Sequence, residues 1–313
     1  MFITYLKRLR KKISHRLFIN LTRLNRLFFR SGSQEVYILT KKHTLFLAKS
    51  LHRNLEVNGV KSKIFSNNRM KIFSNNICIV ICPQEFKYLP PNDLLISYQL
   101  EQYVSNWFDR SYLSILKESR AVWDYSLKNI EYLLENGIDE KKISYVPVSI
   151  DIKCAELSNT LERDIDILFY GDIRSDRRKN ILQSISEKYN IKIISDLYGS
   201  DLVEVLLKTK LVLNIHFYEN ALLETTRICE ALSHGCDVLS ETSSDMKYYP
   251  ELLESNKVTF FQLNDLNDLI SKLDKYFENE RDCCHNSLVE NSAYLSCSEY
   301  LEKAIAKDIY NFK

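Results

Sequence analysis

The sequence lacks the patterns that would place it in several common classes of protein. It has only 6 glycines and 5 prolines in 313 residues, and it contains neither a G-x-G-x-x-G dinucleotide fingerprint nor a Walker A motif. No apolar run approaches the roughly 18–20 residues that span a bilayer. With 45% apolar and 27% charged residues, the composition is that of an ordinary globular chain rather than a disordered, collagen-like or disulfide-scaffold one.

The cysteines show no C-x-x-C spacing. They are Cys78, Cys82, Cys154, Cys229, Cys236, Cys283, Cys284 and Cys297. The adjacent pair at 283–284 has poor geometry for a disulfide or for zinc. The uninterrupted apolar core of a secretory signal peptide is also missing, so we expect a reducing, cytoplasmic compartment.

Acidic residues are absent from the first 30 positions. That stretch holds nine Lys or Arg residues, whereas the rest of the chain holds 34 basic and 41 acidic residues. Its apolar residues recur every three or four positions, which predicts a basic amphipathic helix over 1–30. Such a helix is typical of attachment to an anionic membrane surface. A helix docked on the protein, a transit sequence and a nucleic-acid-binding segment are the alternatives, and nucleic acid is disfavoured because the remaining chain is net acidic.

From residue 35 onward, short apolar runs alternate with amphipathic helical stretches. This alternation predicts α/β domains with doubly wound parallel sheets. We expect an N-terminal domain at 31–150, a linker at 151–163, a C-terminal domain at 164–280 and closing helices at 281–313. Two such Rossmann-like domains imply a cleft between them, with ligands bound beyond the carboxyl ends of the strands.

The loop YGDIRSDRRKN, after the first strand of the second domain, is rich in cations. Gly171 gives the backbone freedom just past the strand. Four cations follow it: Arg174, Arg177, Arg178 and Lys179. Guanidinium groups and the N–H groups of a helix terminus both favour oxyanions, so the loop predicts a diphosphate site. A charged helical turn that faces water is the alternative.

The segment LVLNIHFYENALLETTRICEALSHGCDVLSE, at 211–241, predicts a strand, a helix over 221–234 that begins near Asn220, and a second strand. A rotation of 100° per residue puts Glu224, Arg227 and Glu230 on one side of that helix. By spacing alone they form an i, i+3 ladder worth about 0.2–0.5 kcal/mol per pair. Three polar residues lie at the end of the first strand, where a ligand would bind, so we count them as candidate donor-binding residues: His216, Tyr218 and Glu219.

Three segments resemble those of GT-B glycosyltransferases. EALSHGCDVLSE is similar to their carboxy-terminal signature, ENGIDEKKISYVPV to the segment before their interdomain linker, and ILFYGD to the first strand and glycine of their donor domain. The resemblance covers most of residues 35–280. It implies two domains facing a cleft, a nucleotide-diphosphate-sugar donor on the second domain, an acceptor mainly on the first, and no need for a bound metal or other cofactor.

The resemblance also implies roles for individual residues. Glu230 matches the glutamate that contacts the donor ribose, and the cations at 174–179 match the basic residues near the donor phosphates. Retaining members usually carry a second glutamate eight positions earlier, where this chain has Leu222. The sugar-contacting role is therefore open to Glu219 or Glu224, and the stereochemistry stays open. We predict that Arg178→Ala removes most turnover with little loss of fold.

In the first domain, two glutamates follow apolar strands: Glu85 in CPQEF and Glu101 in YQLEQ. An inverting transferase needs a base for the acceptor hydroxyl. We expect Glu101, then Glu85, with Asp124 as a third candidate. The sequence thus favours a glycosyltransferase acting on a glycan or lipid-linked acceptor at the cytoplasmic face of a membrane. The alternatives are a non-catalytic two-domain sugar- or nucleotide-binding or scaffold protein, and a sugar-nucleotide epimerase.

Overall fold

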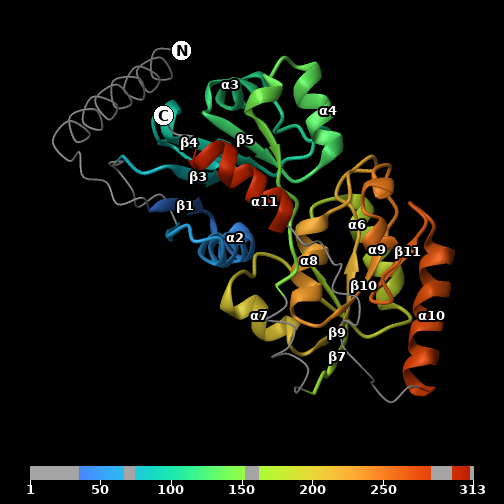
Figure 1. Ribbon diagram of the computed structural model, residues 1–313. Coiled ribbons are helices and arrows are strands. Elements are labelled where there is room, and N and C mark those ends of the chain that lie inside the picture. Colours follow the sequence, from blue (N-terminus) through green and yellow to red (C-terminus); the bar gives the residue numbers. More distant parts are fainter. Residues whose placement is uncertain (1–34, 67–74, 152–161, 283–297, 311–313) are drawn as a thin grey trace, which may run out of the picture. The chain divides into compact units, whose positions relative to one another are not determined.

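The computed structural model describes four stretches of the chain (Figure 1). They are residues 35–66, 75–151, 162–282 and 298–310. The predicted amphipathic helix at 1–30 and most of the predicted linker lie outside these stretches. The chain divides into two compact units, Met1–Val146 with Ser298–Lys313, and Pro147–Cys297.

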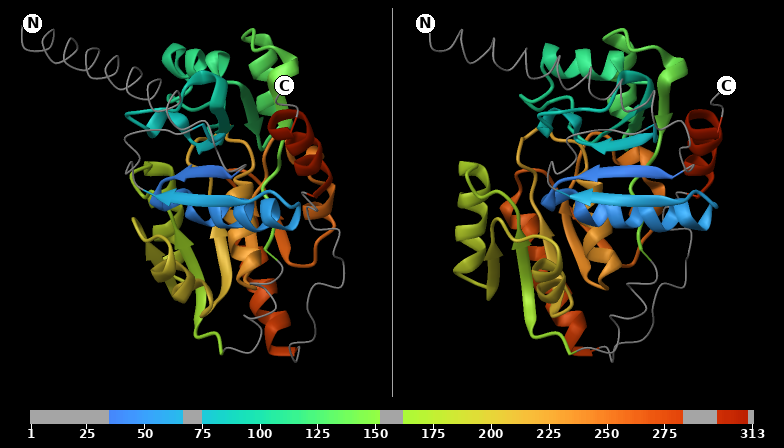
Figure 2. Two further views of the ribbon diagram at one scale, coloured as in Figure 1. Left: turned by 60° about the vertical axis from the view of Figure 1, so that its left-hand side comes forward. Right: turned by 90° about the vertical axis from the view of Figure 1, so that its left-hand side faces the viewer.

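The first unit is built on a six-stranded parallel sheet with the order β2-β1-β3-β4-β5-β6. Its strands are β1 (Val36–Thr40), β2 (Ser62–Ser66), β3 (Cys78–Ile81), β4 (Leu95–Gln99), β5 (Ala121–Asp124) and β6 (Ile143–Tyr145). Its helices are α2 (Leu45–Val57), α3 (Arg110–Glu118) and α4 (Leu127–Glu135), and Figure 2 shows α2 running alongside β1 and β2. The strand order reverses between β1 and β3, which makes that boundary a topological switch point.

The second unit is built on a five-stranded parallel sheet with the order β11-β10-β9-β7-β8. Its strands are β7 (Ile165–Tyr170), β8 (Ile191–Ile194), β9 (Thr209–Asn214), β10 (Asp237–Glu241) and β11 (Val258–Phe261). Its helices are α6 (Asp176–Ser186), α7 (Ser200–Leu206), α8 (Thr225–Ser233), α9 (Pro250–Leu253) and α10 (Leu266–Asp282). The switch point of this sheet lies between β7 and β9.

Local signals explain these elements. The side chain of Asp109 caps α3 by accepting a hydrogen bond from the N–H of Tyr112 (2.8 Å), and Ser175 caps α6 in the same way. Gly137 follows α4 at φ +74°, in the left-handed region that favours glycine after a helix. The central strands are apolar on both faces because helices cover both, as the fully buried Ile167 and Leu168 of β7 illustrate.

The closing segment returns to the first unit. Helix α11 (Ser298–Ala304) continues into a π-helical turn, Ile305–Tyr310. The carboxylate of Asp308 accepts hydrogen bonds from Trp123 Nε1 and Ser144 Oγ, both at 2.8 Å. The described part of the expected closing helices therefore packs on the N-terminal domain.

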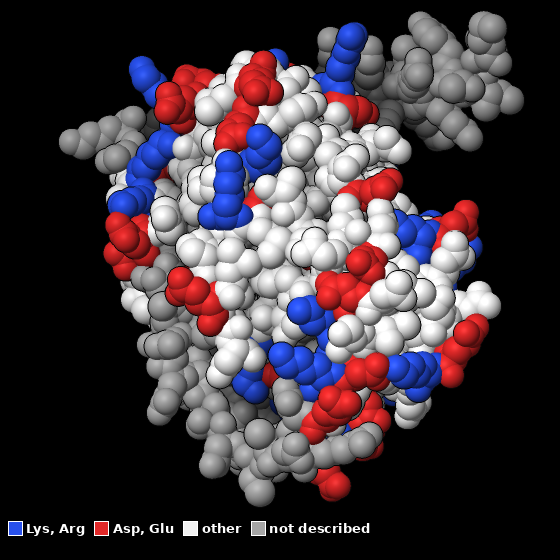
Figure 3. All heavy atoms as spheres, turned by 90° about the vertical axis from the view of Figure 1, so that its right-hand side faces the viewer, with Lys and Arg blue, Asp and Glu red and all other residues white. Residues whose placement is uncertain are grey.

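The surface drawn in Figure 3 mixes charges of both signs. Lys and Arg side chains lie among Asp and Glu side chains on that face, so it presents no extended area of one charge among the described residues. Within the same residues, no helix combines the length and the apolar character that crossing a membrane requires.

Candidate functional site

The carboxyl ends of β7 and β9 hold a network of buried charge, which we call the arginine cluster: Arg178 from α6, with Glu224 and Arg227 from the start of α8. The carboxylate of Glu224 accepts a hydrogen bond from Arg178 (2.9 Å) and forms an ion pair with Arg227. The three side chains are only 3%, 17% and 14% exposed, in that order. Glu224 and Arg227, which helical spacing alone placed in a surface ladder, are therefore largely shielded from solvent.

Arg178 is fixed by backbone oxygens on both sides. Its guanidinium donates to the carbonyl of Ile215 (2.6 and 2.9 Å) and to that of Asp172 (2.9 Å). It also lies over the rings of Phe169 and Phe217, 5.4 and 5.3 Å from their centroids. Because Arg178→Ala would leave these buried acceptors without their donor, we expect it to destabilise the second unit, in contrast to the expectation from the sequence.

Gly171 lets the Arg227 guanidinium approach the backbone closely. The residue follows β7 at φ +143°, and a Cβ placed there would lie 2.9 Å from Arg227 Nη2. Arg227 also donates to the side-chain oxygen of Asn214, at the end of β9. Gly171, predicted to give the backbone freedom after the strand, thus also leaves space for the Arg227 guanidinium.

The two glutamates of α8 differ in charge state. Burial alone would raise the pKa of Glu224, but the Arg227 and Arg178 guanidiniums outweigh burial and hold that pKa well below its usual value. Burial raises the pKa of Glu230 to about 7, against weaker opposition from a hydrogen bond donated by Tyr170 (3.2 Å) and from Arg227. Near neutral pH, Glu224 is anionic and Glu230 is poised between its two states.

Two buried side chains beside the cluster have polar atoms without hydrogen-bond partners among the described residues. They are His216, at both ring nitrogens, and Thr225, at its hydroxyl. Nδ1 of the fully buried His216 lies 3.8 Å from Glu224 Oε1, beyond hydrogen-bonding distance. Because buried polar atoms are normally paired, these two side chains leave unused hydrogen-bonding capacity beside the arginine cluster.

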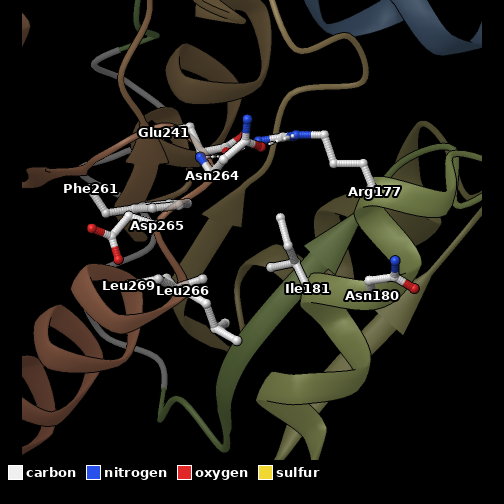
Figure 4. A pocket seen from close by; sticks show the side chains of 9 residues that line it. All are labelled: Arg177, Asn180, Ile181, Glu241, Phe261, Asn264, Asp265, Leu266 and Leu269. Atoms are coloured by element: carbon white, nitrogen blue, oxygen red, sulfur yellow. Dashed lines mark hydrogen bonds and ion pairs between the residues drawn. The ribbon is translucent and has the colours of Figure 1, made fainter.

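Arg177 lies next to the cluster, at the edge of a small recess (Figure 4). Its guanidinium forms an ion pair with the fully buried Glu241 and donates to the carbonyl of His216 (2.9 Å) and to Asn264 Oδ1 (2.7 Å). The recess has a volume of about 170 Å³, and its lining is Arg177, Asn180, Ile181, Glu241, Phe261, Asn264, Asp265, Leu266 and Leu269. Ligand pockets usually measure about 300–1,000 Å³, so this recess alone holds only part of a nucleotide sugar.

Several predicted donor residues lie outside the arginine cluster. They are Arg174, Lys179, Tyr218, Glu219 and Asn220. The Arg174 side chain is 88% exposed and pairs with Asp172, and Lys179 pairs with Asp176 of its own helix. Glu219 is exposed and accepts a hydrogen bond from Asn264 (2.8 Å). Asn220 is also exposed, whereas Tyr218 is half-buried against Phe217.

Helix α8 begins at Thr225, so the expected start near Asn220 is wrong. The residues at 221–223 are buried in the preceding loop, where the N–H of Leu223 donates to Asp245 Oδ1 (3.0 Å). Their apolar character extended the helical pattern in the sequence. Leu222, at the position of the second glutamate of retaining enzymes, is fully buried and belongs to the core.

In the first unit, two candidate bases lie near the carboxyl ends of β3 and β4. Glu85 ends a 3₁₀ turn after β3 and forms an ion pair with His43 Nε2 (3.0 Å), from a turn after β1. Glu101 follows β4 and is half-buried, and burial raises its pKa, as does the nearby Glu85. Asp124 is fully buried, and its carboxylate accepts hydrogen bonds from the Gln99 side chain and the Ser126 N–H. Because the carboxylate is not exposed, it cannot contact a substrate.

Sequence reasoning missed two residues that hold these sites together. Glu241 closes an apolar strand, and a polar residue at that place was a signal that could have been used. His43 lies in TKKHT, where neither periodicity nor a motif marks it. Its importance comes only from the pairing of β1 with β3.

No protein-family model and no curated protein matches the sequence, but solved structures do. AviGT4, a glycosyltransferase involved in avilamycin A biosynthesis, aligns over 87% of this chain and 96% of its own, with a TM-score of 0.51 and 9% identity. HepE of Anabaena, in complex with UDP and glucose, aligns over 87% and 95% (TM-score 0.47, 10% identity). UDP-GlcNAc 2-epimerase of Neisseria meningitidis, bound to UDP-GlcNAc, aligns over 87% and 100% (TM-score 0.46, 13% identity). The chain has the GT-B fold, with two Rossmann-like domains.

Proposed function

We propose that this protein is a glycosyltransferase that moves a sugar from a nucleotide-diphosphate-sugar donor to a glycan or lipid-linked acceptor. The observation that carries the proposal is the arginine cluster at the switch point of the second sheet. Ligands of doubly wound sheets bind at this place. The likeness to a glycosyltransferase structure supports the proposal through the fold alone.

Arg227 binds the donor diphosphate in this proposal. A guanidinium attracts phosphate oxygens and can donate two parallel hydrogen bonds to them. Arg178 is a positioning residue, because it holds Glu224, which in turn holds Arg227. Since these groups are fixed before the reaction, they stabilise the charge on the leaving nucleotide without rearranging.

Glu101 accepts the proton of the acceptor hydroxyl, and Glu85 is the second candidate. A raised pKa makes a carboxylate a stronger base, which favours the half-buried Glu101. The acceptor oxygen bonds to the anomeric carbon while the bond from that carbon to the diphosphate breaks. Arginine side chains take up the phosphate charge, so the proposed transfer needs no bound metal or other cofactor. We place the reaction at the cytoplasmic face of a membrane, with residues 1–30 on anionic lipid.

A donor screen tests the proposal. Nucleotide-diphosphate sugars are added singly to the full chain, and the unfolding temperature is measured. At least one should raise it, and Arg227→Gln should lower the affinity for that donor about 10- to 100-fold, because a charged hydrogen bond is worth about 1.5–3 kcal/mol. Lys179→Gln, a cation of the same predicted group on the helix surface, is the control and should bind as the wild type does. Equal affinity in the Arg227→Gln variant would refute the assignment.

Turnover separates the alternatives. A transferase releases free nucleotide only when acceptor is added, an epimerase changes the sugar nucleotide without acceptor, and a binding protein does neither. Glu101→Gln should reduce transfer while donor affinity stays unchanged. Transfer at the wild-type rate in this variant would exclude Glu101 as the base.

A further inference from the structure

Three side chains with different metal-binding atoms meet at the switch point of the first sheet. Cys82 directly follows β3, Glu85 lies three residues later, and His43 comes from the turn after β1. One ligand atom from each, an imidazole nitrogen, a sulfur and a carboxylate oxygen, lie within 4.8 Å of one another. We propose that His43, Cys82 and Glu85 bind a single zinc-like divalent cation. The donor function proposed for the second unit does not enter this inference.

The ligand set fits the chemistry of Zn²⁺. Zinc is bound by imidazole nitrogen, thiolate sulfur and carboxylate oxygen at about 2.0–2.3 Å, so the ligand atoms of a tetrahedral site are about 3.3–3.7 Å apart. His43 Nε2 and Glu85 Oε1 are already 3.0 Å apart. Shifts of about 1 Å or less would bring all three into range, and the side chains of His43 and Glu85, 42% and 31% exposed, have room to make them.

The exposure of the three side chains also suits a metal site. Cys82 is buried at 5% exposure, which fixes one ligand, while the partly exposed His43 and Glu85 leave a route from solvent. Three protein ligands leave a fourth position for water. When the cation is bound, Glu85 is no longer available as a base, which leaves Glu101 as the candidate for that role.

The competing explanation is that His43 and Glu85 form an ordinary surface pair that happens to lie beside a core cysteine. A second His–Glu pair in the chain is a matched control for this explanation. His52 lies 4.0 Å from Glu56 on α2, a His–Glu pair of similar exposure for which the described residues provide no neighbouring third ligand. If a His–Glu pair were sufficient, the two sites would behave alike.

The test uses the full chain, stripped with a chelator and titrated with Zn²⁺ against a chromophoric competitor, then with Co²⁺ to record thiolate-to-metal charge-transfer absorption. We expect Cys82→Ser to abolish the absorption assigned to this site. Cys82→Ser, His43→Asn and Glu85→Gln should each weaken Zn²⁺ binding at least about tenfold. His52→Asn should bind as the wild type does.

Two outcomes would overturn the site. In the first, the wild-type protein takes up no Zn²⁺ in the presence of the competitor. In the second, the Cys82→Ser variant keeps both the wild-type affinity for Zn²⁺ and the thiolate-to-cobalt absorption band. Circular dichroism checks the fold of each variant, and the exposed position of Glu85 makes Glu85→Gln the informative substitution if Cys82→Ser misfolds. Neither readout requires turnover, so a failed glycosyltransferase assay leaves this result standing.

Discussion

Replacing Glu224 with Gln removes the one carboxylate that two buried guanidiniums share. Arg178 and Arg227 are 3% and 14% exposed on their side chains, so neither recovers full hydration when its partner is lost. Removing one member of a buried ion pair costs about 3–5 kcal/mol. Because the Gln amide oxygen still accepts one hydrogen bond, we expect Glu224→Gln to lower the free energy of unfolding of the second unit by about 3 kcal/mol.

The dependence on pH gives this prediction a second test. The pKa of Glu224 is lowered in the folded protein, so its stabilising effect is present above the unfolded pKa of about 4.3 and is lost as the pH falls towards the folded value. The stability gap between wild type and Glu224→Gln should therefore be constant from pH 7 to about pH 5. It should narrow as the solution becomes more acidic.

The loss of stability is measured by unfolding the protein in urea and monitoring hydrogen exchange in peptides of the second unit. Both tryptophans, Trp107 and Trp123, belong to the first unit, so their fluorescence should report an unchanged transition there. The control is Asp166→Asn, which breaks the more exposed pair of Asp166 with Lys210 (2.9 Å) and should cost at most about 1 kcal/mol. A Glu224→Gln effect no larger than this control, or a gap that persists in acid, would refute the buried-network account.

Two further predictions concern the same unit. Gly171→Ala should lower the free energy of unfolding by about 1–3 kcal/mol in urea, since φ +143° strains any residue with a Cβ; an unchanged urea midpoint would contradict the close approach of Arg227. The raised pKa of Glu230 means that its charge destabilises the fold as the pH rises from its unfolded pKa through about 7, so Glu230→Gln should stabilise the protein at pH 8 more than at pH 5. An equal effect of Glu230→Gln at both pH values, in thermal unfolding, would show that Glu230 titrates normally.

Most strands and helices could be predicted from the sequence, because the spacing of apolar residues that defines them extends over only a few residues. β7, β9 and β10 are apolar runs closed by polar residues, and periodicity predicted each of them close to its observed bounds. The start of α8 could not be found in this way. Buried loop residues at 221–223 repeat the apolar spacing of a helix although they pack as irregular chain.

The site could be predicted in outline only, because its contacts join distant parts of the chain. Arg178 and Glu224 are 46 residues apart, and Arg177 and Glu241 are 64 apart. The sequence located these charges at strand ends and helix starts, but only the pairing of β7 with β9 determines that Arg178 points inward while Lys179 points outward.

The burial of the arginine cluster is itself an argument for a ligand. Well-packed apolar side chains of similar volume often stabilise a fold as well as a buried ion pair, or better, so stability alone gives no reason to place three charges beneath the edge of a sheet. Two guanidiniums share one carboxylate here, which leaves the cluster with a net positive charge. A fixed, incompletely neutralised pair of arginines attracts an anion more strongly than an exposed pair, since less water must be displaced and no side chain must be ordered. A diphosphate would supply the missing negative charge, which is why Arg227→Gln should lower donor affinity as well as stability.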